Sequence, residues 1–129
     1  SRPLVIGDRL DTDIEGAVAA GMPAMMVLTG VHGPADLLAA DPARRATHLA
    51  YDLTAVNTQG EDFRIASAAE LGGDVHDGRL EVDHLPENLT GVPLARAVIR
   101  EGWRHGVDRV TSRSVAVRSR LAGAGFAVD

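Results

Sequence analysis

Three aspartates within six residues are the feature of the sequence most able to do chemistry. Asp8, Asp11 and Asp13 follow a short apolar run at residues 3–7 that ends in glycine. A continuous apolar run of this length is typical of a buried parallel strand. Ligands of open α/β sheets bind outside the carboxyl ends of the strands. The aspartates therefore lie where a ligand is expected.

Clustered carboxylates repel one another unless a cation neutralises them. A hard divalent ion such as Mg²⁺ takes oxygen ligands, usually one or two carboxylates together with water and phosphate. The pattern predicts a Mg²⁺-assisted phosphate site, with Asp8 at the strand end as a metal ligand. Asp11 and Asp13 have an alternative interpretation, as acidic residues that stabilise the start of the next helix. We favour that alternative for Asp11.

The elements that must position these aspartates form a strand–loop–helix–strand unit. A helix is expected to start near Thr12, where Thr12 and Glu15 have the spacing of a capping box. Gly21 is its expected end, and residues 24–29 form the next strand, with both methionines as core residues. Such a unit predicts a right-handed parallel crossover.

The rest of the chain alternates between short helices and short strands. The Asp77-Gly78 pair between alternating residues predicts a hairpin. Trp103 is expected to pack the longest helix onto that hairpin. The expected elements are a helix at 35–40, a strand at 47–53, a helical turn at 54–57, a linker at 59–62, a hairpin at 73–83, a helix at 93–105 capped by Gly106, a strand at 107–111, a helix at 114–122 and a last strand after Gly125.

Residues 7–14 resemble the fourth sequence motif of the haloacid-dehalogenase superfamily phosphatases. Their Thr-Asp-Ile ending is similar to the subgroup of p-nitrophenylphosphatase and phosphoglycolate phosphatase, which carries a large cap domain. The likeness continues through Gly21-Met22-Pro23 and residues 27–31 and covers roughly residues 3–57. The resemblance implies an α/β fold in which residues 1–57 are the C-terminal segment of a Rossmann-like, parallel-sheet phosphatase core.

The resemblance also implies roles for individual residues. Asp8 is the Mg²⁺ ligand of the motif, and Asp13 is a supporting catalytic-site carboxylate that orients ligands or metal-bound water. The family's aspartate nucleophile, acid/base aspartate and phosphate-binding lysine are not identifiable, because seven residues precede Asp8 and lysine is absent. We therefore expect the C-terminal portion of a cytoplasmic phosphatase, inactive alone. Its partners are upstream core and cap segments and a small phosphomonoester such as glycerol 3-phosphate or phosphoglycolate.

Residues 58–129 resemble the later part of GNAT acetyltransferases, as a small α+β module. In that family a long helix leads to a strand, and a further helix ends in a Gly-Phe turn, as at Gly125-Phe126. The acyl-CoA loop of the family is replaced by residues 88–93, where one glycine survives and Pro93 removes a donor. A packing or regulatory module is therefore expected. A phosphatase core with such a tail is similar to actinobacterial glycerol-3-phosphate phosphatases.

The alternative to an enzyme is a binding or regulatory module. All 13 basic residues are arginines, and seven lie between Arg96 and Arg120. These arginines either recognise an acyl-CoA, a nucleotide or another anion, or form a solvated helix face. The five histidines show no metal-ligand spacing, and each is expected to be a surface or capping residue.

Composition excludes several classes of protein. A net charge of -5 and a pI near 5.4 exclude a generically basic nucleic-acid binder. Apolar residues make up 45% of the 129, which is enough for a packed core. The sequence holds no cysteine, no lysine and no apolar run of membrane-spanning length. No secretory signal opens the chain, so a cytoplasmic location is expected.

Overall fold

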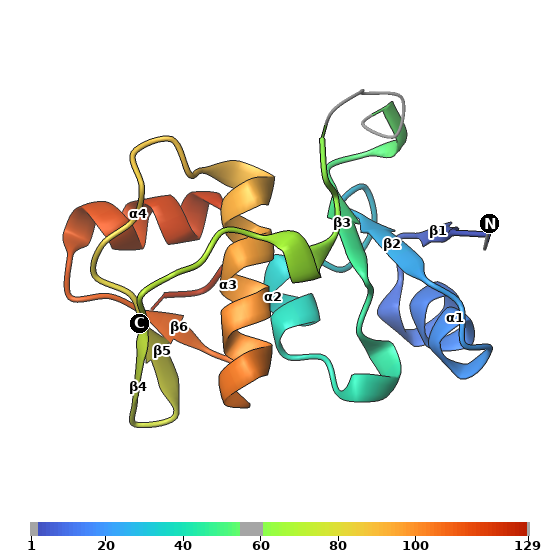
Figure 1. The fold of residues 1–129 in the computed structure, drawn as a ribbon, viewed down its shortest axis with the longest axis horizontal. Coiled ribbons are helices and arrows are strands. Elements are labelled where there is room, and N and C mark those ends of the chain that lie inside the picture. Colours follow the sequence, from blue (N-terminus) through green and yellow to red (C-terminus); the bar gives the residue numbers. More distant parts are fainter. Residues whose placement is uncertain (1–2, 55–60, 129) are drawn as a thin grey trace.

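The N-terminal half folds around a small parallel sheet. The computed structural model describes residues 3–54 and 61–128. Strands β1 (Val5–Gly7), β2 (Ala24–Val27) and β3 (His48–Ala50) pair in the order β1-β2-β3, all parallel. This sheet lies at the N-terminal end of the molecule (Figure 1). The parallel crossover expected from the sequence is confirmed, with each strand shorter than predicted.

The helical segment after β1 starts earlier than predicted. A π-helical turn (Leu10–Ile14) leads into α1 (Glu15–Ala19). No side chain caps either start, so the predicted capping box at Thr12 is wrong. Thr12 lies inside the π-helical turn and not at its start, so it cannot act as the N-cap residue. At the start of the turn, the backbone N–H of Leu10 donates to Nδ1 of His32 over 2.9 Å. Gly21, at a φ of 69°, ends the segment as predicted.

Two short helical segments connect β2 to β3. Helix α2 (Pro34–Leu38) is followed by a 3₁₀ turn (Pro42–Arg44), in which the Asp41 side chain accepts a hydrogen bond from Ala43 N–H. The predicted helical turn at 54–57 and linker at 59–62 lie largely outside the described residues, so their structures stay predictions.

The C-terminal half contains the predicted hairpin. Strands β4 (Asp74–His76) and β5 (Arg79–Glu81) pair antiparallel. Both turn residues have positive φ, 53° at Asp77 and 74° at Gly78, which is the geometry of a type I′ turn. A third strand, β6 (Val110–Thr111), joins β5 in parallel, giving the order β4-β5-β6.

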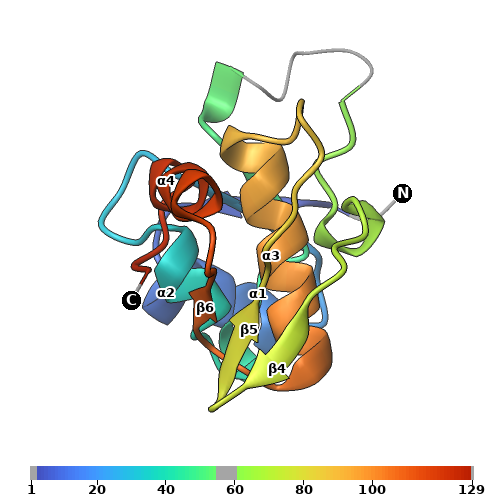
Figure 2. The same ribbon diagram turned by 90° about the vertical axis from the view of Figure 1, so that its left-hand side faces the viewer.

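Two helices accompany this second sheet. Helix α3 (Gly91–His105) ends at Gly106, whose φ of 71° is the left-handed cap predicted from the sequence. Helix α4 (Val115–Gly123) is capped by the Ser114 side chain, which accepts a hydrogen bond from Val117 N–H. Figure 2 shows α3 beside the hairpin and α4 above β6. The predicted last strand is reduced to a bridge between Val128 and Val110.

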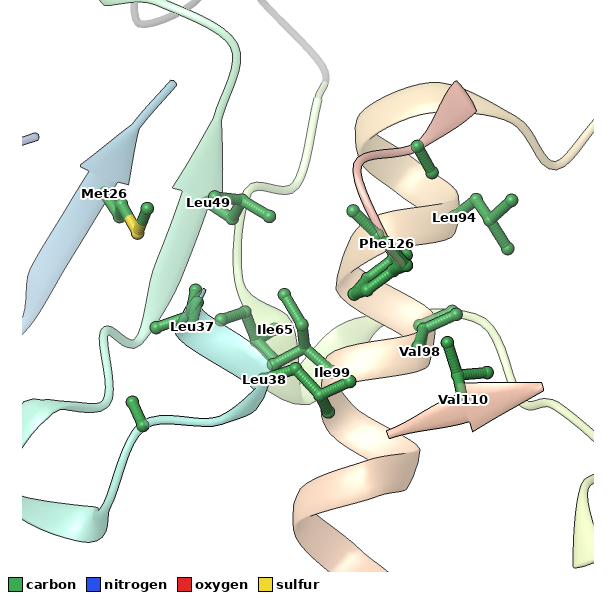
Figure 3. Packing of buried hydrophobic residues seen from close by; sticks show 14 of the residues in the cluster. Met26, Leu37, Leu38, Leu49, Ile65, Leu94, Val98, Ile99, Val110 and Phe126 are labelled. Atoms are coloured by element: carbon green, nitrogen blue, oxygen red, sulfur yellow. The ribbon is translucent and has the colours of Figure 1, made fainter. Parts of the chain in front are cut away.

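One buried cluster joins the two halves. Leu38 of α2 lies beside Ile99 of α3, and Leu37 lies on the side of the first sheet, which contributes Met26 and Leu49 to the same cluster (Figure 3). A Cβ at Gly102 would come 3.1 Å from the carbonyl oxygen of Val107 and would clash with Leu38. Glycine therefore permits the close approach of α3 to α2. The division proposed at residues 57 and 58 stays a prediction.

Trp103 packs against α2, not against the hairpin as predicted. Its Nε1 donates to the carbonyl oxygens of Leu37 and Leu38, each over 3.2 Å. The Arg45 guanidinium lies 4.9 Å from the indole centroid. The prediction was wrong because the face of α3 that carries Trp103 meets α2.

Arg96 links α3 to the first sheet from within the core. It is only 4% exposed. Its Nε donates to the carbonyl oxygen of Leu49 over 2.7 Å, and Nη2 pairs with Glu61 over 2.7 Å. The Phe63 ring lies 5.2 Å from the guanidinium carbon. A charged side chain thus connects helix and strand in place of apolar packing.

Asp83 fastens the hairpin to the segment between β6 and α4. Its carboxylate accepts hydrogen bonds from the Arg113 backbone and guanidinium at 2.7 to 2.9 Å and from Ser112 Oγ at 3.2 Å. The hydrogen bonds from Arg113 lower the pKa of Asp83 from 3.8 to about 2. A carboxylate with a lowered pKa stabilises the fold above its unfolded pKa and loses that effect as the pH falls.

We expect Asp83→Asn to lower the urea midpoint at neutral pH. The difference from the unmodified chain should shrink as the pH falls from about 4 towards 2, because protonation then removes the same interaction from the unmodified chain. Urea unfolding measured at several pH values checks this. Asp108→Asn is the control, since Asp108 is exposed. A difference that stays constant down to pH 2 would contradict this role of Asp83.

No helix in the described ranges is long and apolar enough to cross a membrane.

Candidate functional site

Asp8 stands at the carboxyl edge of the parallel sheet. It directly follows β1 and is half-buried, and Gly30 lies in the loop after the neighbouring strand β2. A Cβ built on Gly30 would lie 2.5 Å from Cγ of Asp8, closer than two carbon atoms can approach. The carboxylate therefore lies directly against the Gly30 backbone. Only glycine leaves room for it there.

Asp13 is directed back to the end of the same strand. It lies in the π-helical turn, and a Cβ on Gly7 would come 2.6 Å from its Cγ and its Oδ2. The Asp13 side chain thus packs against the last residue of β1, which immediately precedes Asp8. The structure brings these two predicted site residues together at one strand end.

Asp11 has a different environment. Its carboxylate forms two hydrogen bonds of 3.1 Å with the Arg9 guanidinium, through Nε and Nη2. The hydrogen bonds from Arg9 lower the pKa of Asp11, and the same pair raises the pKa of Arg9. Both residues are exposed, so this pair is a surface contact within the loop. The interpretation of Asp11 as a residue of the helix start stays a prediction.

His32 and the two glycines are the site features that sequence reasoning missed. His32 lies in the loop after β2 and accepts the Leu10 backbone N–H through Nδ1, which ties that loop to the loop after β1. Nδ1 must be unprotonated for this bond, so the neutral ring carries its proton on Nε2. No local signal could identify His32, because its partner is a backbone group 22 residues away.

The donor chemistry of this edge fits a hard cation. Carboxylate oxygens are the ligands that Mg²⁺ prefers. The Asp13 and Asp8 side chains occupy the space that a Cβ would fill at Gly7 and at Gly30, respectively. This close packing holds both carboxylates at the strand end. In the part of the chain that the structure describes, no three acidic, histidine or cysteine side chains are grouped closely enough to hold a metal. Asp8 is the residue of this edge best placed to contribute one ligand.

We expect Gly30→Ala to disturb this edge more than Gly33→Ala. The new Cβ at position 30 must displace the Asp8 carboxylate, whereas a Cβ at position 33 meets no atom within 4 Å. In the longer protein, Gly30→Ala should lower Mg²⁺-dependent activity by about tenfold or more, within the range seen when metal-site geometry is perturbed. Steady-state kinetics at varied Mg²⁺ measure this. Equal effects of the two substitutions would contradict the close packing of Asp8 on Gly30.

The arginines of the C-terminal half do not form one free anion-binding face. Most are engaged by protein groups: Arg96 with Leu49 and Glu61, Arg100 and Arg104 with Glu70, Arg113 with Glu81 and Asp83, and Arg120 with the carbonyl oxygens of Pro86 and Leu89. Much of the arginine content therefore serves internal contacts.

Comparison with known proteins shows similarity to hydrolases. Residues 1–56 match the model of the family described as HAD-hydrolase-like. The chain is 41% identical over 106 residues to the D-glycerol 3-phosphate phosphatase of Mycobacterium tuberculosis, an alignment that covers 78% of this chain and 30% of that protein.

Two solved structures of a glycerol phosphate phosphatase from Mycobacterium tuberculosis are also similar. The complex with magnesium gives a TM-score of 0.83 at 35% identity, covering 98% of this chain and 39% of that one. The complex with calcium gives a TM-score of 0.78 at 32% identity, and the match covers 100% of this chain and 40% of that one. The chain thus spans less than half the length of each relative. Residues 1–56 therefore match the HAD-hydrolase-like family model, and the chain is similar to a portion of the mycobacterial glycerol 3-phosphate phosphatase.

Proposed function

We propose that this chain is the C-terminal portion of a Mg²⁺-dependent phosphatase that hydrolyses small phosphomonoesters such as glycerol 3-phosphate or phosphoglycolate. The placement of Asp8 at the carboxyl end of β1, against Gly30, carries the proposal. The relatives named for this activity, one of them in complex with magnesium, support it.

Asp8 would hold the metal through a carboxylate oxygen, and the remaining protein ligands would come from an upstream segment. When bound, Mg²⁺ neutralises charge on the phosphoryl group. Asp13 would act beside it as a positioning carboxylate, held in place by its packing on Gly7. His32 would keep the two loops in register through its bond to Leu10. These roles need no lysine from this chain.

The nucleophile would be an aspartate upstream of this chain. It would attack phosphorus and break the ester P–O bond, so that the alcohol leaves with a proton and an aspartyl phosphate forms, which water then hydrolyses to inorganic phosphate and free aspartate. A cap segment of the same longer protein would select the substrate. Alone, the 129-residue chain should release no phosphate.

The test is phosphate release by the longer protein from glycerol 3-phosphate and phosphoglycolate, with and without Mg²⁺. We expect activity that disappears when the metal is removed by a chelator and returns when Mg²⁺ is added. The 129-residue chain is the matched control and should be inactive under both conditions. A longer protein that is inactive on both substrates with Mg²⁺ would contradict the proposal.

We further propose that residues 58–129 form a GNAT-like packing or regulatory module, in a protein of the cytoplasm. The order of elements supports this, since α3 leads to β6 and α4 leads to the Gly125-Phe126 turn. Thermal shift with coenzyme A tests whether the module retains acyl-CoA binding. We expect no shift beyond the one that adenosine 3′,5′-bisphosphate, the nucleotide part of coenzyme A, gives alone, because Pro93 occupies the first turn of α3. Cellular fractionation tests the location.

A further inference from the structure

A cleft of about 480 Å³ opens between α3 and the segment that leads into β3. Its floor is apolar, formed by Ala46, Ile65 and Ala66. The Trp103 indole and the guanidinium groups of Arg45, Arg100 and Arg104 complete its lining. The volume lies within the range of about 300 to 1,000 Å³ that small-molecule sites occupy.

Arg45 is held ready to bind a ligand. Its guanidinium lies over the indole of Trp103, and its Nε donates to the carbonyl oxygen of Ala40 over 3.1 Å. The indole is itself fixed by the two bonds from Nε1 to the α2 carbonyl oxygens. Among the described residues, no other hydrogen bond or ion pair involves Arg45. Both Nη groups of a positioned guanidinium therefore remain available.

The charge around the cleft favours an anion. Arg100 pairs with Glu70 over 3.0 Å, and Arg104 pairs with Glu70 over 3.3 Å and with Glu101 over 3.0 Å. Neither carboxylate lines the cleft, while all three arginines do. The three guanidiniums outnumber these two carboxylates, so a net positive charge faces the opening.

We propose that this cleft binds an aromatic phosphate of the size of a purine nucleoside monophosphate. The ring would lie on the apolar floor beside the stacked Arg45 and Trp103. The phosphate would accept hydrogen bonds from the Nη groups of Arg45 and from Arg104, whose Nη1 alone is engaged within the described ranges.

This site is separate from the proposed phosphatase site. Thr47, which lines the cleft, directly precedes β3, so the cleft lies at the amino edge of the parallel sheet. Asp8 lies at the carboxyl edge of that sheet. A ligand here would therefore not occupy the phosphatase site, and its binding can be tested whether or not the longer protein is a phosphatase.

Trp103 provides a direct readout, because it is the only tryptophan in the sequence. We would titrate the 129-residue chain with adenosine 5′-monophosphate and follow indole fluorescence, with calorimetry as a second measurement. The expected result is saturable quenching by the nucleotide. The Kd for adenosine alone and the Kd for inorganic phosphate alone should each be at least about tenfold higher than the Kd for the nucleotide, since each makes only half of its contacts.

Arg45→Gln should weaken nucleotide binding about tenfold, because it removes a charge-assisted pair of hydrogen bonds. Arg118→Gln is the matched control, since Arg118 does not line the cleft, and it should bind as the unmodified chain does. Circular dichroism establishes that both variants are folded. If Arg45→Gln is unfolded, Arg45→Lys replaces it and should bind more weakly than the unmodified chain, since lysine has no planar pair of donors.

The proposal is overturned by an absence of saturable binding at millimolar nucleotide. It is also overturned if phosphate alone binds as tightly as the nucleotide, or if substitutions at Arg45 and Arg118 have equal effects. The first outcome would show that the cleft is not a nucleotide site. The second would show that the ring does not contribute to binding, and the third that Arg45 does not.

Discussion

Replacing Asp8 by asparagine in the longer protein is expected to reduce Mg²⁺-dependent phosphate release by more than about 100-fold. Asparagine has nearly the same shape as aspartate, so it should fit against Gly30 as the carboxylate does. It lacks the negative charge that a Mg²⁺ ligand supplies. The fold should therefore be preserved while the affinity for the metal and the turnover fall together.

The measurement is kcat/KM at increasing Mg²⁺, combined with thermal unfolding. Asp11→Asn is the matched control: it lies three residues away, but its carboxylate pairs with Arg9 at the surface, so activity should stay within about twofold. The kcat/KM of Asp13→Asn should lie between those of the other two variants, about 10- to 100-fold below that of the unmodified protein. An Asp8→Asn protein as active as the Asp11→Asn protein would remove Asp8 from the metal site.

Replacing Arg96 by leucine is expected to lower the free energy of unfolding by about 3 kcal/mol, or the melting temperature by about 10 °C. The substitution leaves the buried carbonyl oxygen of Leu49 without its donor and removes the contact with the Phe63 ring. Glu61 loses its partner but is 38% exposed, so water can solvate its charge. The loss is therefore dominated by the buried carbonyl group.

Chemical denaturation of the 129-residue chain measures this loss. Arg118→Leu is the control, because among the described residues Arg118 bonds only through its backbone N–H, to Ser114, and its side chain forms no hydrogen bond or ion pair there, so its effect should stay within about 0.5 kcal/mol. If the two substitutions cost the same, the bonds of Arg96 to Leu49 and Glu61 contribute nothing to the docking of α3. A loss confined to Arg96→Leu would establish α3 as a structural support of β3.

Several elements of the fold could be predicted from local sequence. The Asp77-Gly78 turn and the glycine caps at Gly21 and Gly106 depend on neighbouring backbone alone. The order of strand, helix and strand between residues 3 and 29 likewise follows from short-range periodicity. These predictions succeeded because the deciding interactions lie within a few residues of each other.

The errors at Thr12 and Trp103 have a common physical cause. At Thr12, the helical turn begins two residues earlier than predicted, at Leu10, whose backbone N–H bonds to His32 of another loop. At Trp103, the amphipathic pattern of α3 predicts that the residue packs, but not against which element. The packing partner is α2, because the indole Nε1 donates to the carbonyl oxygens of its last two residues, Leu37 and Leu38. Long-range partners leave no trace in local sequence.

The sequence by itself determined which residues can do chemistry: three aspartates after a strand, one of them at its very end. Residue type and spacing are sufficient for that inference, because a strand end and the preference of Mg²⁺ for oxygen ligands are both local properties. Only the tertiary structure decided how the Asp8 carboxylate is packed. It lies against Gly30, which is 22 residues away in the sequence, and close packing of this kind depends on backbone that is brought together by folding.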